Sequence, residues 1–169
     1  MSVEDLEKYL ARCGERYSEE QHLLGCTYKS HGYHTRIPDG AWAHTIGSSL
    51  DYALVVLRTR DRRRIDRAIA ILRKLLTLQD TDPTSRTYGL WPWLLEEPLH
   101  AMATPCWNEA DFRGLRLAQI LIDHADLLPD DLVPGIRQAV GHAAWSIFRR
   151  NMPPGYTNIA VMGAAATLA

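Results

Sequence analysis

The stretch Arg62-Arg-Arg-Ile-Asp-Arg-Ala-Ile-Ala-Ile-Leu-Arg-Lys-Leu-Leu-Thr-Leu-Gln79 decides the fold that the sequence predicts. Its apolar residues recur at steps of three and one, and they are Ile65, Ala68, Ile69, Leu72, Leu75 and Leu76. This spacing is typical of an amphipathic helix that packs along one face. A similar apolar stripe runs through residues 43–59, and only a few residues separate the two segments. Because so short a link makes neighbouring helices antiparallel, the two segments predict a helical hairpin.

Further helices are expected on both sides of this hairpin. Ser2 suits the N-cap of a first helix, because Asp5 follows it at the position of a capping box. A second hairpin is expected from a helix that opens at Asn108 and a helix that follows Pro129. A sixth and almost uniformly apolar helix is expected to end at residue 169.

Two stretches rich in Gly and Pro, 21–40 and 80–107, predict long loops, with at most a short strand pair at 26–28 and 33–36. The sequence therefore predicts an all-α fold of antiparallel helical hairpins, with the long loops at one end. The whole chain, 1–169, is expected to form a single domain.

The composition excludes several classes of function. The chain has 169 residues, and its 19 Lys and Arg against 20 Asp and Glu give a net charge of −1. This balance lacks the basic excess of a nucleic-acid-binding protein, and the arginine cluster at 58–67 is interpreted as a solvated helix turn. No apolar run reaches the ~20 residues that span a bilayer, and the acidic start lacks a signal peptide. We therefore expect no nucleic-acid partner, no membrane partner and a cytoplasmic location.

Metal and cofactor motifs are also missing from the sequence. The three cysteines are scattered, and none of the seven histidines follows a zinc-site spacing. His31 and His34 lie three residues apart, but no acidic residue joins them at helical spacing. No glycine-rich phosphate loop is present. The sequence therefore predicts no metal and no cofactor.

Tryptophan and carboxylate residues gather in the longer loop and just after it. The aromatic residues are Trp91, Trp93 and Trp107, and the nearby acids include Glu96, Glu97 and Asp111. Such a combination favours a sugar site, since a pyranose stacks on an aromatic ring while acids and amides bind its hydroxyls. Glu97 and Asp111 are the candidates for general acid and base in glycoside cleavage, which uses two carboxyl groups.

Structural interpretations of the same residues stay open. Asn108 with Asp111 three residues later fits a helix N-cap and a first-turn acid. The tryptophans could instead pack over helix ends as a lid. His34, His44 and His100 stand next to the loops and could serve as hydrogen-bond partners or as a general base.

Three segments together resemble a known family, and they read Gly89-Leu-Trp-Pro-Trp-Leu-Leu-Glu-Glu-Pro-Leu99, Trp107-Asn-Glu-Ala-Asp-Phe112 and Gly155-Tyr-Thr-Asn-Ile-Ala160. They resemble the six-hairpin glycosidase-like proteins, whose α/α toroids alternate inner and outer helices. In those proteins, loops that enter the inner helices bind and cleave sugar chains. The resemblance implies part of an (α/α)n toroid that binds an oligosaccharide or polysaccharide. It places at the mouth Trp107, Asn108, Asp111, Tyr156 and Asn158, and in the loop above it Trp91, Trp93, Glu96 and Glu97.

The chain is short for a whole toroid, which needs twelve helices and about 300 residues. We therefore expect a fragment or truncated relative of a glycoside hydrolase or polysaccharide-processing enzyme, with hydrolase and lyase chemistry both open. Either further residues or self-association with a second copy should cover the apolar helix at 159–169. The alternative is a non-enzymatic helical-repeat module that binds a protein or peptide, and it gains if the tryptophans are buried. An isoprenoid-type cyclase is the least favoured, because Asp80-Thr-Asp82 matches its acidic motif poorly.

Overall fold

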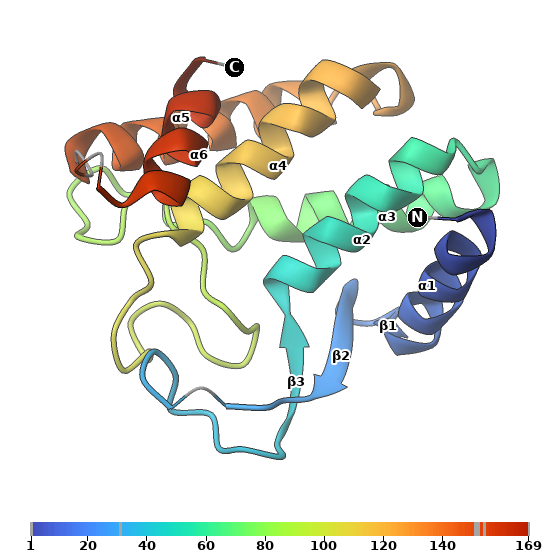
Figure 1. The fold of residues 1–169 in the computed structure, drawn as a ribbon, viewed down its shortest axis with the longest axis horizontal. Coiled ribbons are helices and arrows are strands. Elements are labelled where there is room, and N and C mark those ends of the chain that lie inside the picture. The colour runs from blue at the N-terminus through green and yellow to red at the C-terminus, as the bar shows by residue number, and fades with distance from the viewer. Residues whose placement is uncertain (1, 31, 151–152, 154, 169) are drawn as a thin grey trace.

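The computed structural model describes residues 2–30, 32–150, 153 and 155–168, with side chains up to residue 165 in the last helix (Figure 1). The helices are α1 (Val3–Arg16), α2 (Ile46–Thr59), α3 (Arg62–Leu76), α4 (Glu109–His124), the short 3-10 helix η1 (Ala125–Leu127), α5 (Leu132–Arg150) and α6 (Thr157–Leu168). The strands are β1 (Tyr17–Ser18), β2 (Leu23–Thr27) and β3 (Trp42–Thr45). In Figure 1, α1 lies at one end of the molecule and α6 at the other.

The predicted all-α fold class is wrong, because the described chain also holds a three-stranded antiparallel sheet in the order β1-β2-β3. β2 falls in a stretch expected to be mostly loop, and it pairs with β3 rather than with residues 33–36. β3 in turn contains the residues that were expected to begin the second helix. The physical reason is local: Gly25 lies under the Trp42 indole, and a Cβ at Gly25 would come within 2.5 Å of that ring. The glycine that suggests a loop is thus what lets an aromatic side chain cross the sheet.

The helical hairpins lie close to the predicted ranges and form the core. α2 packs against α3, α4 packs against α5, and α6 packs on both α4 and α5. Of the predicted stripe of α3, Ala68, Leu72 and Leu75 have no exposed surface, and Ile71, which lies outside that stripe, is buried with them. Burial of each of these leucine and isoleucine side chains contributes about 1.5–3 kcal/mol of transfer free energy. The two hairpins meet where α2 contacts α4.

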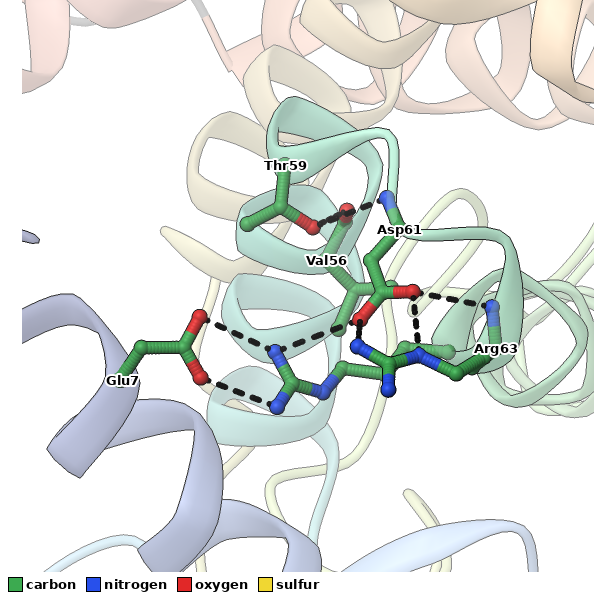
Figure 2. A network of polar contacts seen from close by, with 6 residues as sticks. Glu7, Val56, Thr59, Asp61 and Arg63 are labelled. Carbon is green, nitrogen blue, oxygen red and sulfur yellow. Dashed lines mark hydrogen bonds and ion pairs between the residues drawn. The ribbon is translucent and has the colours of Figure 1, made fainter.

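The arginine-rich turn between α2 and α3 is held by acidic partners (Figure 2). Asp61 is the N-cap of α3, and its Oδ1 accepts a hydrogen bond of 3.1 Å from the Arg63 main chain. Glu7 of α1 accepts a hydrogen bond of 3.0 Å from Arg64 Nη2, which fastens α1 to the hairpin. Thr59 donates to the Val56 carbonyl at 2.7 Å and closes the last turn of α2. These contacts make the cluster a solvated and internally paired turn.

The two long loops lie together below the N-terminal ends of α2 and α4 (Figure 1). The main-chain N–H of Ala103 donates to the His34 carbonyl at 3.1 Å, and the N–H of Ile46 donates to the Trp93 carbonyl at 3.0 Å. Leu94 forms an isolated β-bridge with Thr45, which extends the free edge of β3. The loops thereby bring distant parts of the chain to the start of α4.

Candidate functional site

A cavity of about 330 Å³ lies between the loop that follows α3 and the C-terminal end of α5. This volume is at the lower end of the ~300–1,000 Å³ range of small-molecule sites. We name it the α5 pocket, and its lining residues are Ser85, Arg86, Tyr88, Trp107, Ser146, Arg149 and Arg150. It combines aromatic rings, hydroxyls and guanidinium groups from three separate elements.

Ser85, Arg86 and Tyr88 form the loop wall of the α5 pocket, and Asp80 forms hydrogen bonds within this loop. Its carboxylate accepts hydrogen bonds from the hydroxyls of Ser85 at 2.5 Å and Thr87 at 2.6 Å. Its carbonyl accepts a hydrogen bond of 2.7 Å from the N–H of Gly89. These contacts of Asp80 with Ser85, Thr87 and Gly89 hold the main chain of the loop on the pocket wall.

Tight packing fixes this wall against α5. Gly89 has a φ of +82°, and a Cβ there would lie 2.4 Å from the His142 carbonyl oxygen. The hydroxyl of Tyr88 hydrogen-bonds His142 Nδ1 at 2.6 Å. The buried Gln79 amide donates to the carbonyls of Gly89 at 3.1 Å and Ala139 at 3.0 Å. The approach of the loop to the helix therefore needs a glycine at position 89.

Arg150, one of the lining residues, belongs to a polar network at the start of α4. Asp111 has no exposed surface and forms an ion pair with Arg150, in the last turn of α5. Arg150 also donates to Asn108 Oδ1 at 3.3 Å, and Asn108 Nδ2 donates to the Tyr156 hydroxyl at 3.3 Å. Burial raises the pKa of Asp111, while the charge of Arg150 opposes that rise. The positive charge of Arg150 is therefore neutralised by Asp111.

Two other arginines leave the pocket positively charged. Arg86 and Arg149 are exposed, and neither has an ion-pair partner within 2–30, 32–150, 153 and 155–168. No acidic residue is among the described lining residues. Trp107 lines the pocket and is 37% exposed. The pocket thus offers an aromatic face beside two unpaired cations.

The structure brings together several residues that the sequence singled out for the mouth. Trp107 lines the pocket, and Asn108, Asp111 and Tyr156 form the polar network that includes the lining residue Arg150. Asn158 lies exposed in the first turn of α6. Asn108 occupies the N-cap position of α4, but its side chain makes no capping hydrogen bond and binds Arg150 instead.

The remaining tryptophans occupy different environments. Trp91 has no exposed surface, and its Nε1 donates to the Leu75 carbonyl at 3.0 Å, so it belongs to the core rather than to a sugar platform. Trp93 is half-buried and meets His34 edge-on with ring centroids 4.9 Å apart. Tyr33 adds a second edge contact to Trp93 at 6.2 Å. These rings join the two long loops.

The candidate carboxylates of the loop lie outside the α5 pocket. Glu97 is 3% exposed, and its Oε1 accepts a hydrogen bond of 2.6 Å from the Arg36 main chain. Glu96 binds the ring of His44 at 2.5 Å and its main-chain N–H at 2.9 Å. No contact joins Glu97 to Asp111 in the described part of the chain. Acid–base chemistry by this pair stays a prediction, without a shared cavity to support it.

Sequence reasoning missed a second buried ion pair next to this region. Glu109 opens α4 with 3% exposure, and its Oε2 lies 2.6 Å from Arg113 Nη2. Burial raises the pKa of Glu109, while Arg113 and the Trp93 side chain favour its charged form. The Arg113 guanidinium lies against Gly47, where a Cβ would be 2.5 Å away. In the sequence, the (i, i+4) spacing of Glu109 and Arg113 on a predicted helix indicates that the two side chains can form an ion pair.

Sequence reasoning also missed the cationic wall of the pocket. Arg86 lies in the middle of a loop, and Arg149 reads as an ordinary basic residue in the last turn of a helix. Their meeting depends on the docking of the loop against α5 through Gly89, which no local pattern encodes. In the sequence, the glycine in Tyr88-Gly89 is the feature that is compatible with a close contact between this loop and another element.

Two absences hold for the described residues. They contain no group of three His, Cys, Asp or Glu that could hold a metal ion, and His31 lies outside them. Among them, no helix combines the length and the apolar character that crossing a membrane requires.

Comparison with known proteins identifies a family. The family described as Domain of unknown function (DUF8769) matches residues 20–168, which include every element from β2 to α6, so the chain belongs to this family. No curated protein and no solved structure matches the chain.

Proposed function

We propose that this member of the DUF8769 family binds a carbohydrate in the α5 pocket. The single observation that carries the proposal is the partly exposed ring of Trp107 in the lining of a cavity that also holds hydroxyls and guanidinium groups. The C–H face of a pyranose stacks on such a ring, and the pocket hydroxyls and guanidinium groups would bind its hydroxyls. Oligosaccharides and polysaccharides that end in such a ring are the proposed partners.

Fixed geometry supports this proposal. Tyr88 is anchored by His142, and Arg150 is anchored by Asp111 and Asn108, so a ligand would meet side chains that are already in place. Preorganisation of this kind lowers the entropic cost of binding. At about −0.3 kcal/mol per non-hydrogen atom, a disaccharide of ~23 atoms would bind with a Kd on the order of 10 µM.

The proposal concerns binding and assigns no cleavage step. Asp111 is enclosed and ion-paired, and Glu97 lies outside the pocket. A pair of carboxyl groups that flanks a glycosidic bond needs access to the same ligand.

Titration calorimetry and tryptophan fluorescence test the proposal. Maltose, cellobiose, lactose and sucrose serve as ligands for the wild type, for Trp107→Ala and for Trp42→Ala. Trp42 is the matched control, because it is 62% exposed but lies on β3 and does not line the pocket. We expect Trp107→Ala to weaken binding at least tenfold and Trp42→Ala to leave it unchanged. Absence of binding to all four sugars, or equal effects of the two variants, would contradict the proposal.

We also place this activity in the cytoplasm. The support is the state of the cysteines: Cys13, Cys26 and Cys106 are all free thiols. A reducing compartment maintains free thiols. Cell fractionation of the tagged full-length protein tests the location, and recovery in a membrane or secreted fraction would contradict it.

A second candidate function, the binding of a protein, is favoured by one separate observation. Trp145 and Phe148 of α5 stack at 5.5 Å between centroids and are 50% and 69% exposed. A second copy of the chain is the partner that is simplest to test. Sedimentation that depends on concentration and is abolished in Trp145→Ala/Phe148→Ala would support it, and a monomer at all concentrations would count against it.

A further inference from the structure

We infer that the carbohydrate in the α5 pocket carries a phosphate group, which Arg86 and Arg149 bind. This inference rests on the proposed carbohydrate function and names the ligand class more narrowly. It starts from the charge of the pocket, which an uncharged sugar would leave unbalanced.

The charge balance selects the anion. Asp111 neutralises Arg150, while Arg86 and Arg149 have no acidic partner among the described residues. The lining itself therefore carries two unpaired positive charges, and the nearby Asp80 carboxylate binds the hydroxyls of Ser85 and Thr87 rather than either arginine. A phosphate monoester brings about −1.5 to −2 charges at neutral pH, whereas a sugar carboxylate brings only one. Phosphate is thus the group that balances both arginines.

The positions of the two arginines also suit phosphate. Arg86 comes from the loop wall and Arg149 from α5, so the two guanidinium groups approach from different elements. Each can donate two parallel N–H···O bonds, and three phosphate oxygens offer enough acceptors for both. Ser146 also lines the pocket, and its hydroxyl has no hydrogen-bond partner among the described residues. It is available to donate to the same group.

Some exposed arginines of the described chain form ion pairs and others, such as Arg62 and Arg137, form none, so what sets Arg86 and Arg149 apart is that both line one pocket. Arg60 binds Asp126 at 2.7 Å and Arg73 binds Asp131 at 2.7 Å, both at exposed positions. A basic residue at the end of a helix complements the helix dipole, which accounts for Arg149 alone. It does not account for Arg86, which stands in a loop and faces the same cavity. A shared anionic ligand explains both.

Calorimetry at constant ionic strength tests the inference. The ligands are glucose, galactose and mannose, their 6-phosphates, glucuronate and inorganic phosphate. The variants are Arg86→Gln and Arg149→Gln, with Arg137→Gln as the matched control, because Arg137 is exposed on α5 but does not line the pocket. We expect at least one 6-phosphate to bind tenfold or more tightly than its parent sugar. Since a charge-assisted hydrogen bond contributes about a tenfold gain or more, each pocket variant should remove most of that advantage, and Arg137→Gln should keep it.

The other outcomes separate the two proposals. Equal binding of a sugar and its 6-phosphate, or binding of glucuronate as tight as that of the phosphates, would overturn the phosphate inference and leave the sugar pocket standing. Inorganic phosphate that binds as tightly as every sugar phosphate would overturn the carbohydrate function instead. If neither sugars nor sugar phosphates bind to the folded wild type, both proposals are wrong. Loss of the advantage in Arg137→Gln as well would show a general charge effect and overturn the assigned site.

Discussion

Arg150, in the last turn of α5, forms an ion pair with Asp111, which lies in the first turn of α4 and has no exposed surface. This contact joins the two helices of the second hairpin through Arg150, which also lines the α5 pocket. It also explains why Arg150 can line the pocket without adding to its net charge. The same pair therefore serves the fold and the site.

Removal of one partner of this ion pair should be costly. Asp111→Asn leaves the mostly buried Arg150 guanidinium uncompensated, so we expect a loss of about 3 kcal/mol in the free energy of unfolding. Asp131→Asn is the matched control, since its pair with Arg73 is exposed and should contribute less than about 1 kcal/mol. Urea denaturation measures both variants. Equal losses would contradict a structural role for the buried pair.

A side chain at position 89 should be destabilising because it would collide with α5. Gly40, which has a similar φ but open space around it, separates this collision from the effect of the backbone conformation. Gly89→Ala meets both a φ of +82° and a contact with the His142 carbonyl, whereas Gly40→Ala meets a φ of +81° with open space around it. The left-handed conformation alone costs about 1–2 kcal/mol, so Gly40→Ala should lose about that much. Gly89→Ala should lose clearly more, and thermal denaturation measures the difference. If Gly89→Ala loses no more than Gly40→Ala, the close docking of the loop on α5 is refuted.

The buried Glu109 should make the stability depend on pH in a definite direction. Burial raises its pKa, so just above the unfolded value of about 4.3 the native state keeps a proton that the unfolded state has lost. Its contribution to the free energy of unfolding is therefore full below that value and is lost as pH rises through the folded pKa. Urea titrations of the wild type and of Glu109→Gln at several pH values measure this effect. As pH rises, the wild type should lose stability relative to Glu109→Gln. A difference that stays constant, or shifts the other way, would contradict the raised pKa.

Cys106 should react slowly with alkylating reagents. It is 8% exposed, and burial raises the pKa of its thiol, so little thiolate is present at mildly alkaline pH. Cys26 is more exposed and should react first with iodoacetamide in the native protein. Mass spectrometry of the labelled peptides measures the order, and denatured protein is the control in which all cysteines react alike. Labelling of Cys106 ahead of Cys26 in the native state would contradict the burial.

The helices could be predicted from the sequence, but the sheet could not. The period of the apolar residues in α3 is long enough to identify a helix and its buried face. β3 is four residues long and runs directly into α2, so its apolar positions merge with the helical pattern that follows. β2 contains Gly25, which is a loop signal in isolation and a packing requirement once Trp42 crosses it.

The site was predicted in part for a similar reason. Trp107, Asn108 and Asp111 are neighbours in sequence at the start of a helix, so their grouping is local and visible. Arg86 and Arg149 come together only through the docking of the loop on α5. Trp91 shows the opposite error, because a tryptophan in a long loop proved to be part of the core. Local composition reveals which residues could bind a ligand, and tertiary packing decides which of them can be reached.

The indole N–H resonances of the five tryptophans provide the most direct measurement of the central claim, that a carbohydrate binds at Trp107. The resonance of Trp107 is assigned from Trp107→Phe, and ¹H–¹⁵N spectra are recorded as the aldohexose 6-phosphates and the four disaccharides are added. We predict that at least one of these ligands shifts the Trp107 resonance in a saturable manner and leaves those of Trp42 and Trp91 in place. A Trp107 resonance that stays unmoved by every ligand, or moves only together with all the others, would contradict the account.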